Sequence, residues 1–250
     1  MMRRFLSAPA HVFAHLALPS LALASLVLVS AVMFAGAGLA QGHVYTVYQK
    51  NMAFGNNRER ALANDILSRR PDVVTLQEVN RDNDKLLRMI EGSYPAQHWC
   101  WFDGIGGVAV ASRWPIVQGT ADCIRPLGAT AIQVQGPEGK LWAISLHLET
   151  RDKPRHKRQA QKLGQVLSTV RGPMIIGGDF NDLAQSGPVR DVSRGAGVAR
   201  VGKAISSVTV GGLLGVPIDF VCATGGRGET AKLPLLGSDH YGIWARFTMN

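Results

Sequence analysis

A short apolar run that breaks into an acidic turn constrains the fold of this chain more than any other stretch. Pro173–Asp182 begins with Pro-Met-Ile-Ile, the pattern of a buried β-strand, and then breaks at Gly177 and Gly178. Asp179 and Asn181 follow two positions apart, so an extended chain points both side chains to the same side. An acid beside an amide at a strand end suits metal-assisted chemistry on an anionic substrate. Because Asp and Asn also favour ordinary turns, this stretch alone leaves both interpretations open.

The same pattern recurs along the chain, because several apolar runs end in a side chain that is competent for catalysis or ligand binding. An acid inside an apolar strand is costly to bury unless it is paired or bound to a metal. One such break is a turn, whereas six of them predict a site where strand ends converge. The further examples are Asn51, Glu78, His147, Asp239 with His240, and Asp219, which lies within its apolar run.

Hydrophobic periodicity predicts a chain of alternating strands and helices without internal repeats. The expected helices cover 58–70, 85–90 and 158–170, and 151–157 is expected to be an exposed basic segment. The Gly- and Ser-rich stretch 186–215 is expected to form a long loop at the mouth of the site. The expected strands lie at 43–50, 73–79, 99–102, 107–113, near 116, and at 129–135, 141–148, 173–179, 216–223 and 242–249.

The first forty residues have the composition of a targeting segment. Arg3 and Arg4 precede an apolar stretch that runs from Leu21 without charge, and small residues Gly38 and Ala40 match a signal-peptidase site. The stretch is near the roughly 20 residues that span a bilayer, so residues 1–40 are either a signal peptide or an N-terminal membrane anchor. In both cases we expect residues 41–250 to form one domain outside the cytoplasm.

The charge balance favours polyanionic partners. The net charge is +9, and residues 1–40 contribute only Arg3 and Arg4, so it falls to +7 without them. A domain this basic suits nucleic acid, phosphorylated headgroups or an anionic bilayer, although solvated surface charge gives the same count. One basic cluster either follows a phosphate backbone or is the solvated start of a helix. Its members are Arg151, Lys153, Arg155, His156, Lys157 and Arg158.

Cysteine usage is compatible with an oxidising compartment. The three cysteines form no CxxC pair, so a structural zinc site is not expected. Cys100 and Cys123 flank an expected hairpin, and we predict that they pair in a disulfide while Cys222 stays buried and free.

Several motifs together resemble the endonuclease/exonuclease/phosphatase superfamily, which includes DNase I-like and exonuclease III-like nucleases, sphingomyelinases and inositol-polyphosphate phosphatases. The matching segments occur in the family's order and span essentially the whole chain after residue 43. The resemblance implies an α/β (α+β) fold, namely a four-layer sandwich of two packed, mainly antiparallel β-sheets flanked by helices. The segments are Asn51 after the first strand, Leu76–Val79, Ala111–Ile116, Ser145–Leu148, Gly177–Asp182, Ile218–Val221 and Ser238–Tyr241.

The resemblance also implies a divalent metal ion. A phosphodiester resists attack because its anionic oxygens repel a nucleophile, and a cation offsets that charge. Mg²⁺ takes hard oxygen ligands, with Mn²⁺ and Ca²⁺ as alternatives. Glu78 is the first expected ligand, Asn51 lies beside it, and Asp239 is a further candidate.

The remaining motif residues are expected to act on water and on the phosphate. Asp179 is expected to orient or deprotonate the attacking water. His240 with Asp219 resembles the family's His–Asp dyad, whose carboxylate favours the imidazolium. His147 and Asn181 are expected to contact phosphate oxygens, and Arg113 is a further candidate for the same role.

These observations leave three functions open. The first is an exported, Mg²⁺-dependent phosphodiesterase, a monomer that acts on nucleic acid. The second keeps the chemistry but takes a phospholipid or phosphoinositide at the membrane. The third is a catalytically silent binding module of the envelope. The chain lacks obvious DNA-wrapping segments of the abasic-site endonucleases, so damage-specific repair is not expected.

Overall fold

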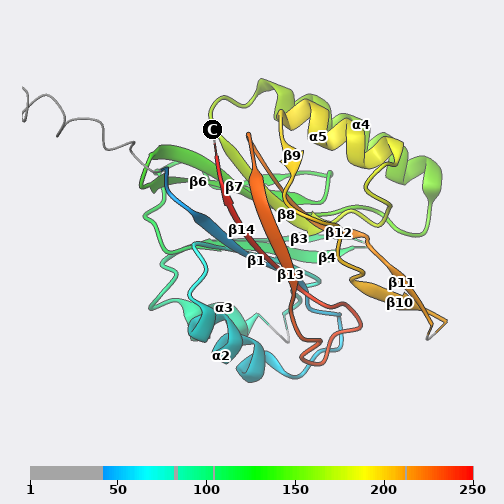
Figure 1. Ribbon diagram of the computed structural model, residues 1–250, viewed down its shortest axis with the longest axis horizontal. Coiled ribbons are helices and arrows are strands. Elements are labelled where there is room, and N and C mark those ends of the chain that lie inside the picture. The colour runs from blue at the N-terminus through cyan, green and yellow to red at the C-terminus, as the bar shows by residue number, and fades with distance from the viewer. Residues whose placement is uncertain (1–41, 82–83, 104, 212, 250) are drawn as a thin grey trace, which may run out of the picture. The chain divides into compact units, whose positions relative to one another are not determined.

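The computed structural model describes residues 42–81, 84–103, 105–211 and 213–249 (Figure 1). The targeting segment predicted at residues 1–40 lies outside this range and stays a prediction. Among the residues described, none of the helices has both the length and the apolar character needed to cross a membrane.

The strands of the described residues form two six-stranded sheets and one separate hairpin. The first sheet has the order β13-β14-β1-β2-β4-β3, and the second has the order β5-β6-β7-β8-β12-β9. The hairpin pairs β10 with β11. Among the strands that the structure describes, only the pairs β1–β2 and β7–β8 are parallel. The bounds are β1 Tyr45–Asn51, β2 Val73–Gln77, β3 Ala96–Phe102, β4 Gly106–Ser112, β5 Asp122–Ile124, β6 Ala129–Gly136, β7 Gly139–His147, β8 Met174–Asp179, β9 Ala199–Arg200, β10 Val208–Val210, β11 Leu214–Val216, β12 Asp219–Ala223, β13 Arg227–Lys232 and β14 Ile243–Thr248.

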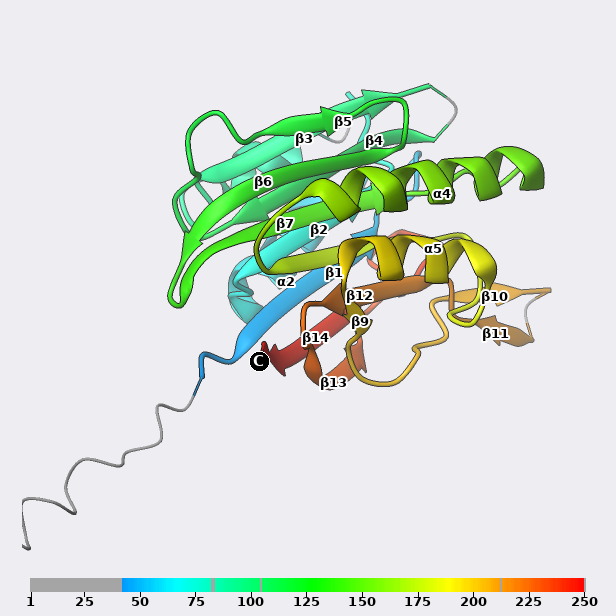
Figure 2. The same ribbon diagram turned by 90° about the horizontal axis from the view of Figure 1, so that it is seen from above.

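Apolar side chains hold these sheets face to face and attach helices to their outer faces. Val47 of β1 packs in the cluster between the sheets, with Ile175 and Val221 of the second sheet. Its neighbour Tyr48 points to the outer cluster, as strand alternation requires. The helices α2 (Glu59–Arg69) and α3 (Lys85–Ile90) cover the first sheet, and α4 (Lys153–Thr169) and α5 (Gly187–Ala196) cover the second (Figures 1 and 2). The four-layer α/β sandwich is therefore confirmed.

The two parallel pairs place four polar strand ends at one edge of the sandwich. Asn51 is opposite Gln77 at the end of β2, so Glu78 follows immediately beside it. In the second sheet His147 is opposite Asp179. Asp219, the first residue of the antiparallel strand β12, is also opposite Asp179. Because parallel strands end at the same edge, these side chains gather there.

The region expected to be a long loop contains regular structure, so that prediction was wrong. Ser186 caps α5 by accepting a hydrogen bond from the Val189 backbone N–H at 3.4 Å, and three short strands follow the helix. The glycines that weaken the helical pattern allow a close contact with α4. A Cβ at Gly195 would lie 2.1 Å from the Gly164 oxygen.

The start of α4 also differs from the prediction. The helix begins at Lys153, not at residue 158, and Asp152 caps it by accepting a hydrogen bond from the Arg155 backbone N–H at 2.9 Å. Pro154 lies in the first turn, where its missing N–H is not needed. Part of the expected exposed segment is therefore helical, and His156 faces inward with 1% exposure.

A disulfide joins the two sheets at one side. Cys100 in β3 bonds to Cys123 in β5, and these strands are edge strands of the first and second sheets. Cys222 is buried and free. Both cysteine predictions are therefore confirmed.

Candidate active site

The Asn51 side chain links the two sheets at the polar edge. Its Nδ2 donates to Glu78 Oε1 at 3.0 Å and to Asp179 Oδ2 at 3.1 Å. Its Oδ1 accepts a hydrogen bond from the Ala53 backbone N–H at 2.9 Å. Glu78 is half-buried and adopts a φ of 57°, so the strand breaks where the carboxylate reaches the edge. Asn51 therefore fixes the spacing between a carboxylate of each sheet.

Asp179 is the buried centre of the cluster. Its Oδ2 lies 3.5 Å from His147 Nε2 and 3.8 Å from His240 Nε2, and its Oδ1 accepts from the Asn181 backbone N–H at 2.9 Å. Burial and then the nearby charge of Asp219 raise the pKa of Asp179 to about 6, against the opposite effect of the two imidazoles. At neutral pH this carboxylate is consequently a stronger base than an ordinary aspartate.

His240 and Asp219 form a buried pair. His240 Nδ1 donates to Asp219 Oδ2 at 2.8 Å, which leaves Nε2 directed toward Asp179. Burial by itself lowers the pKa of His240, but the hydrogen bond and charge of Asp219 raise it to about 9, with help from Asp179 and Asp239. The ring is therefore an imidazolium at neutral pH.

Backbone contacts orient His147 and Asn181. His147 Nδ1 donates to the Ile105 oxygen at 2.9 Å, so Nε2 is the atom that faces the cluster. Asn181 has a φ of 50°, a left-handed conformation that Asn tolerates better than most residues. Its Nδ2 donates to the Leu148 oxygen at 2.9 Å, which uses one of its two amide hydrogens.

A chain of uncharged polar groups between the sheets supports the dyad, and the sequence reasoning did not find it. Gln49 Nε2 donates to Asp219 Oδ1 at 3.0 Å and to Gln77 Oε1 at 2.7 Å. Gln77 in turn donates to Ser145 Oγ at 3.0 Å. The available signal was a glutamine near the polar end of each strand, two residues before Asn51 in β1 and directly before Glu78 in β2. These contacts hold Asp219 in place from the side opposite His240.

Lys50 is a second group that sequence reasoning missed. Its ammonium is buried and donates to the Pro234 oxygen at 3.2 Å and to the His240 oxygen. Burial lowers its pKa to about 8. Lys50 thereby fixes the backbone of His240, whereas its neighbour Asp239 is exposed.

The structure does not bring Arg113 to this cluster. Ser112 pairs with Val73 at the start of β2, whereas Glu78 follows the end of that strand. The two positions are separated by about 13 Å or more at the usual rise of a strand. Arg113 Nη1 instead lies 3.4 Å from Asp72 Oδ1, and its Nη2 donates to the Arg70 oxygen at 3.1 Å. The prediction of a phosphate contact was therefore wrong.

The donor set fits a hard divalent cation. Asp179, Asp219 and His240 offer ligand atoms within 4.8 Å of one another, but His240 Nδ1 and Asp219 already bond to each other. Glu78, Asn51 and the exposed Asp239 also carry carboxylate or amide oxygens, which are the ligands that Mg²⁺ prefers and which can bind a cation while accepting hydrogen bonds.

Acids and imidazoles gathered at one edge of a two-sheet sandwich suit phosphoester hydrolysis, since they combine a base, an acid and oxygen ligands for a cation. The model of the Endonuclease/Exonuclease/phosphatase family matches residues 49–240, and the chain belongs to this family. That match extends from Gln49 to His240 and includes every residue of the cluster. No curated protein matches the chain by sequence.

Solved structures with the same fold include proteins with different ligands. Danio rerio TDP2 complexed with a single-strand DNA product is 19% identical, covers 82% of this chain and 99% of its own, and gives a TM-score of 0.67. A Staphylococcus aureus beta toxin mutant with bound magnesium ions is 14% identical, with coverage of 83% and 100% and a TM-score of 0.61. A family protein from Bacteroides thetaiotaomicron is 13% identical, with coverage of 84% and 96% and a TM-score of 0.62.

Proposed function

We propose that this protein is a divalent-metal-dependent phosphodiesterase that hydrolyses nucleic acid with a water nucleophile, with Mg²⁺ as the expected metal. The observation that carries the proposal is a buried carboxylate, Asp179, facing two imidazoles of which one is held by Asp219. This arrangement separates a base from an acid within one site, as phosphodiester hydrolysis requires.

Asp179 is the base in this proposal. Its pKa of about 6 leaves it ionised at neutral pH while matching its basicity to proton transfer from water. Asn51 and the Asn181 backbone hold the two carboxylate oxygens, so the side chain is oriented before substrate binds.

The histidines act on the phosphate. The His240 imidazolium, stabilised by Asp219, provides a positive charge and a proton at Nε2 for a phosphate oxygen or the leaving oxygen. His147 Nε2 faces the same space and is positioned to contact a phosphate oxygen. The free amide hydrogen of Asn181 is a further donor to that oxygen.

Glu78, Asn51 and Asp239 would hold the metal ion. When bound, the ion offsets the charge of the phosphate and stabilises the leaving oxygen. The role of the protein residues is to keep their oxygen donors at the edge where both sheets end.

Nucleic acid is supported as the substrate by the basic charge of the chain and by the DNA-bound TDP2 structure of the same fold. The apolar composition of residues 1–40 supports export to the periplasm, secretion, or anchoring to the outer face of the inner membrane.

The test compares three substrates for the purified protein, each with Mg²⁺ and with EDTA: plasmid DNA, bis-p-nitrophenyl phosphate and phospholipid vesicles. We expect metal-dependent cleavage of the plasmid and the small diester. Glu78→Gln should raise the Mg²⁺ concentration for half-maximal rate roughly 10- to 100-fold. Absence of turnover on every substrate by folded protein would support a silent binding module instead.

One observation favours a phospholipid as a second candidate substrate. The hairpin β10–β11 carries exposed apolar side chains, with Leu213 95% and Leu214 66% exposed. Its first residue, Val208, forms a β-bridge with His240, so this apolar hairpin adjoins the dyad. Hydrolysis of vesicles without cleavage of plasmid would support this candidate.

A further inference from the structure

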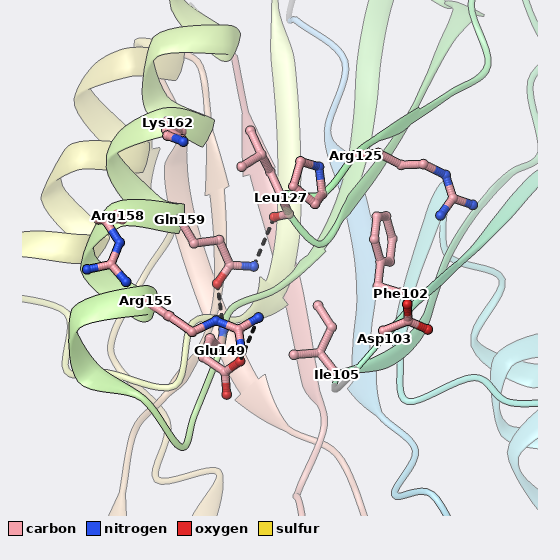
Figure 3. Close-up of a pocket in the computed structure, with 11 residues that line it drawn as sticks. Phe102, Asp103, Ile105, Arg125, Leu127, Glu149, Arg155, Arg158, Gln159 and Lys162 are labelled. Carbon is pink, nitrogen blue, oxygen red and sulfur yellow. Dashed lines mark hydrogen bonds and ion pairs between the residues drawn. The ribbon is translucent and has the colours of Figure 1, made fainter.

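A cleft of about 580 Å³ lies behind His147, since two of its lining residues, Ile105 and Gln159, form hydrogen bonds with that residue. Figure 3 shows this cleft. It lies between α4, the Arg125–Leu127 segment after β5, and the residues Phe102, Asp103 and Ile105. Figure 3 shows the side chains of α4 on one side of this cleft and those of Phe102 and Arg125 on the other.

The wall of this cleft is also the support of His147. Ile105, which lines the cleft, accepts the hydrogen bond from His147 Nδ1. Gln159, also in the lining, donates from Nε2 to the Leu127 oxygen at 3.1 Å and to the His147 oxygen at 3.4 Å. A ligand in the cleft is therefore separated from the catalytic imidazole by a single layer of residues.

One face of α4 supplies most of the positive charge. Arg155, Arg158 and Lys162 line the cleft at spacings of three and four residues, which place them along one side of the helix. Lys153 and Lys157 are exposed on the same helix but are not part of the lining.

The acids in the cleft cancel only part of this charge. Glu149 lies 4.0 Å from Arg155 and also receives backbone N–H groups, and Asp103 is the second acid. Arg125 adds a fourth cation from the opposite wall. The excess of cations suits an anionic ligand.

The cleft also has an apolar surface. Phe102, Pro126 and Leu127 line it, and the Arg125 guanidinium lies 5.4 Å from the Phe102 ring centroid. Phe102 and Leu127 are only 4% and 7% exposed, so they form the floor of the cleft, whereas Arg125 and Pro126 are exposed. An exposed guanidinium plane offers the cation–π and stacking surface that single-stranded nucleic acids use.

We propose that this cleft binds the nucleotide next to the scissile phosphate of a single nucleic-acid strand, an inference that rests on the proposed function. Arg158 and Lys162 contact the flanking phosphate, and Arg125 and Pro126 contact the sugar or base. The cleft thereby makes the enzyme prefer a polynucleotide to a small diester.

The kinetic test compares two double variants of α4 that each remove two positive charges. Arg158→Gln with Lys162→Gln changes the cleft, and Lys153→Gln with Lys157→Gln is the matched control. For each, kcat/KM is measured with Mg²⁺ on a single-stranded oligonucleotide and on bis-p-nitrophenyl phosphate. We expect the oligonucleotide-to-diester ratio to fall roughly 10- to 100-fold for the cleft variant, because charge-assisted phosphate contacts are lost. The control should keep the ratio of the wild type.

A binding test separates failure of the cleft from failure of the proposed function. Fluorescent oligonucleotide is titrated against the full chain in EDTA over a series of salt concentrations. We expect the cleft variant to reduce the slope of log affinity against log salt by about 0.7 for each lost phosphate contact. If no substrate is hydrolysed but this slope still falls, the proposed function fails and the cleft assignment stands.

Three results would overturn the inference. The first is an unchanged oligonucleotide-to-diester ratio and salt slope in the cleft variant. The second is an equal loss in the control variant, which would assign the effect to general surface charge. The third concerns kcat/KM on phosphatidylglycerol vesicles. If the cleft variant loses as much of this rate as it loses on the oligonucleotide, or more, the ligand of the cleft is a lipid and not a nucleic-acid strand.

Discussion

Two buried aspartates lie at opposite ends of the sandwich, and their surroundings differ. Asp72 precedes β2 and is 4% exposed, and Asp179 ends β8 and is 1% exposed. Asp72 accepts hydrogen bonds from the Thr46 backbone N–H and hydroxyl, both at 2.8 Å, and lies near Arg113. Its charge is therefore balanced by donors that belong to the fold.

The charge of Asp179 has fewer donors from the fold to balance it. Its donors are the Asn51 amide and the Asn181 backbone, and a second acid, Asp219, lies close enough to help raise its pKa. Burial thus leaves one carboxylate fully engaged in structure and the other with a raised pKa beside two imidazoles. The comparison teaches that partners, more than burial, distinguish a structural acid from a reactive one.

The largest expected effect is on the rate of the Asp179→Ala variant. We expect kcat/KM on a small diester to fall by roughly 10²–10⁴, because the proposed base is lost. The free energy of unfolding should stay the same or rise, since burial and the charge of Asp219 disfavour the ionised carboxylate that is removed. Steady-state kinetics and urea unfolding measure the two quantities, and near-wild-type Mg²⁺-dependent hydrolysis would remove Asp179 from the mechanism.

Asp72→Ala should show the opposite behaviour. We expect the free energy of unfolding to fall by about 3 kcal/mol, because the buried Thr46 donors and Arg113 lose their acceptor. The folded variant should keep kcat/KM within about threefold of the wild type, since surface and structural sites away from the chemistry act through stability. A rate loss comparable to that of Asp179→Ala would show that the end of the sandwich around Asp72 affects catalysis at the end around Asp179.

The pair of His240 and Asp219 predicts a pH dependence of stability that can be measured in metal-free protein. The pKa of His240 is about 9 in the folded chain and ordinarily about 6.5 in an unfolded one. Between pH 6.5 and 8 the folded chain keeps a proton that the unfolded chain loses, so stability falls as pH rises. The loss over this window is about 2 kcal/mol, from 1.36 kcal/mol per pKa unit. The contribution is complete below pH 6.5 and disappears through pH 9.

Asp219→Asn should flatten this slope, because it removes the main group that raises the pKa of His240, leaving Asp179 and Asp239. Burial lowers the pKa of Lys50 to about 8, so its opposite contribution begins at the upper end of the window and falls mostly above it. Urea unfolding with EDTA at pH 6.5 and 8 measures the slope, and Asp72→Asn is the control that should keep it. An equal slope in the Asp219→Asn protein would contradict the assignment.

The sequence predicted much of the fold because apolar strands with polar ends are local patterns. It failed at 186–215, where the glycines that hide the helical pattern are required by the contact of Gly195 with Gly164. It also failed for β13, an exposed edge strand held by pairing with β14 and without an apolar pattern of its own. These elements depend on contacts between distant segments, which a periodicity does not report.

The candidate site was predictable to the same extent. Most of the predicted strand-end side chains gather as expected, although their catalytic roles stay predictions. They are Asn51, Glu78, His147, Asp179, Asp219 and His240. The supporting contacts of Gln49 and Lys50 were missed, because a polar residue inside a strand has no local sign of its partner. The cleft was missed because its lining comes from three segments far apart in the chain.

Arg113 gives the smallest expected effect and the clearest reason for an error. Glu78 and Arg113 both follow apolar strands, but β2 and β4 are antiparallel, so their ends lie at opposite edges. Arg113→Gln should leave hydrolysis at the wild-type rate and lower the free energy of unfolding by about 1 kcal/mol or less, as for a half-exposed ion pair. Kinetics on the small diester and urea unfolding measure both. A tenfold rate loss at constant stability would return Arg113 to the phosphate site, and strand direction would then not explain which polar ends take part in catalysis.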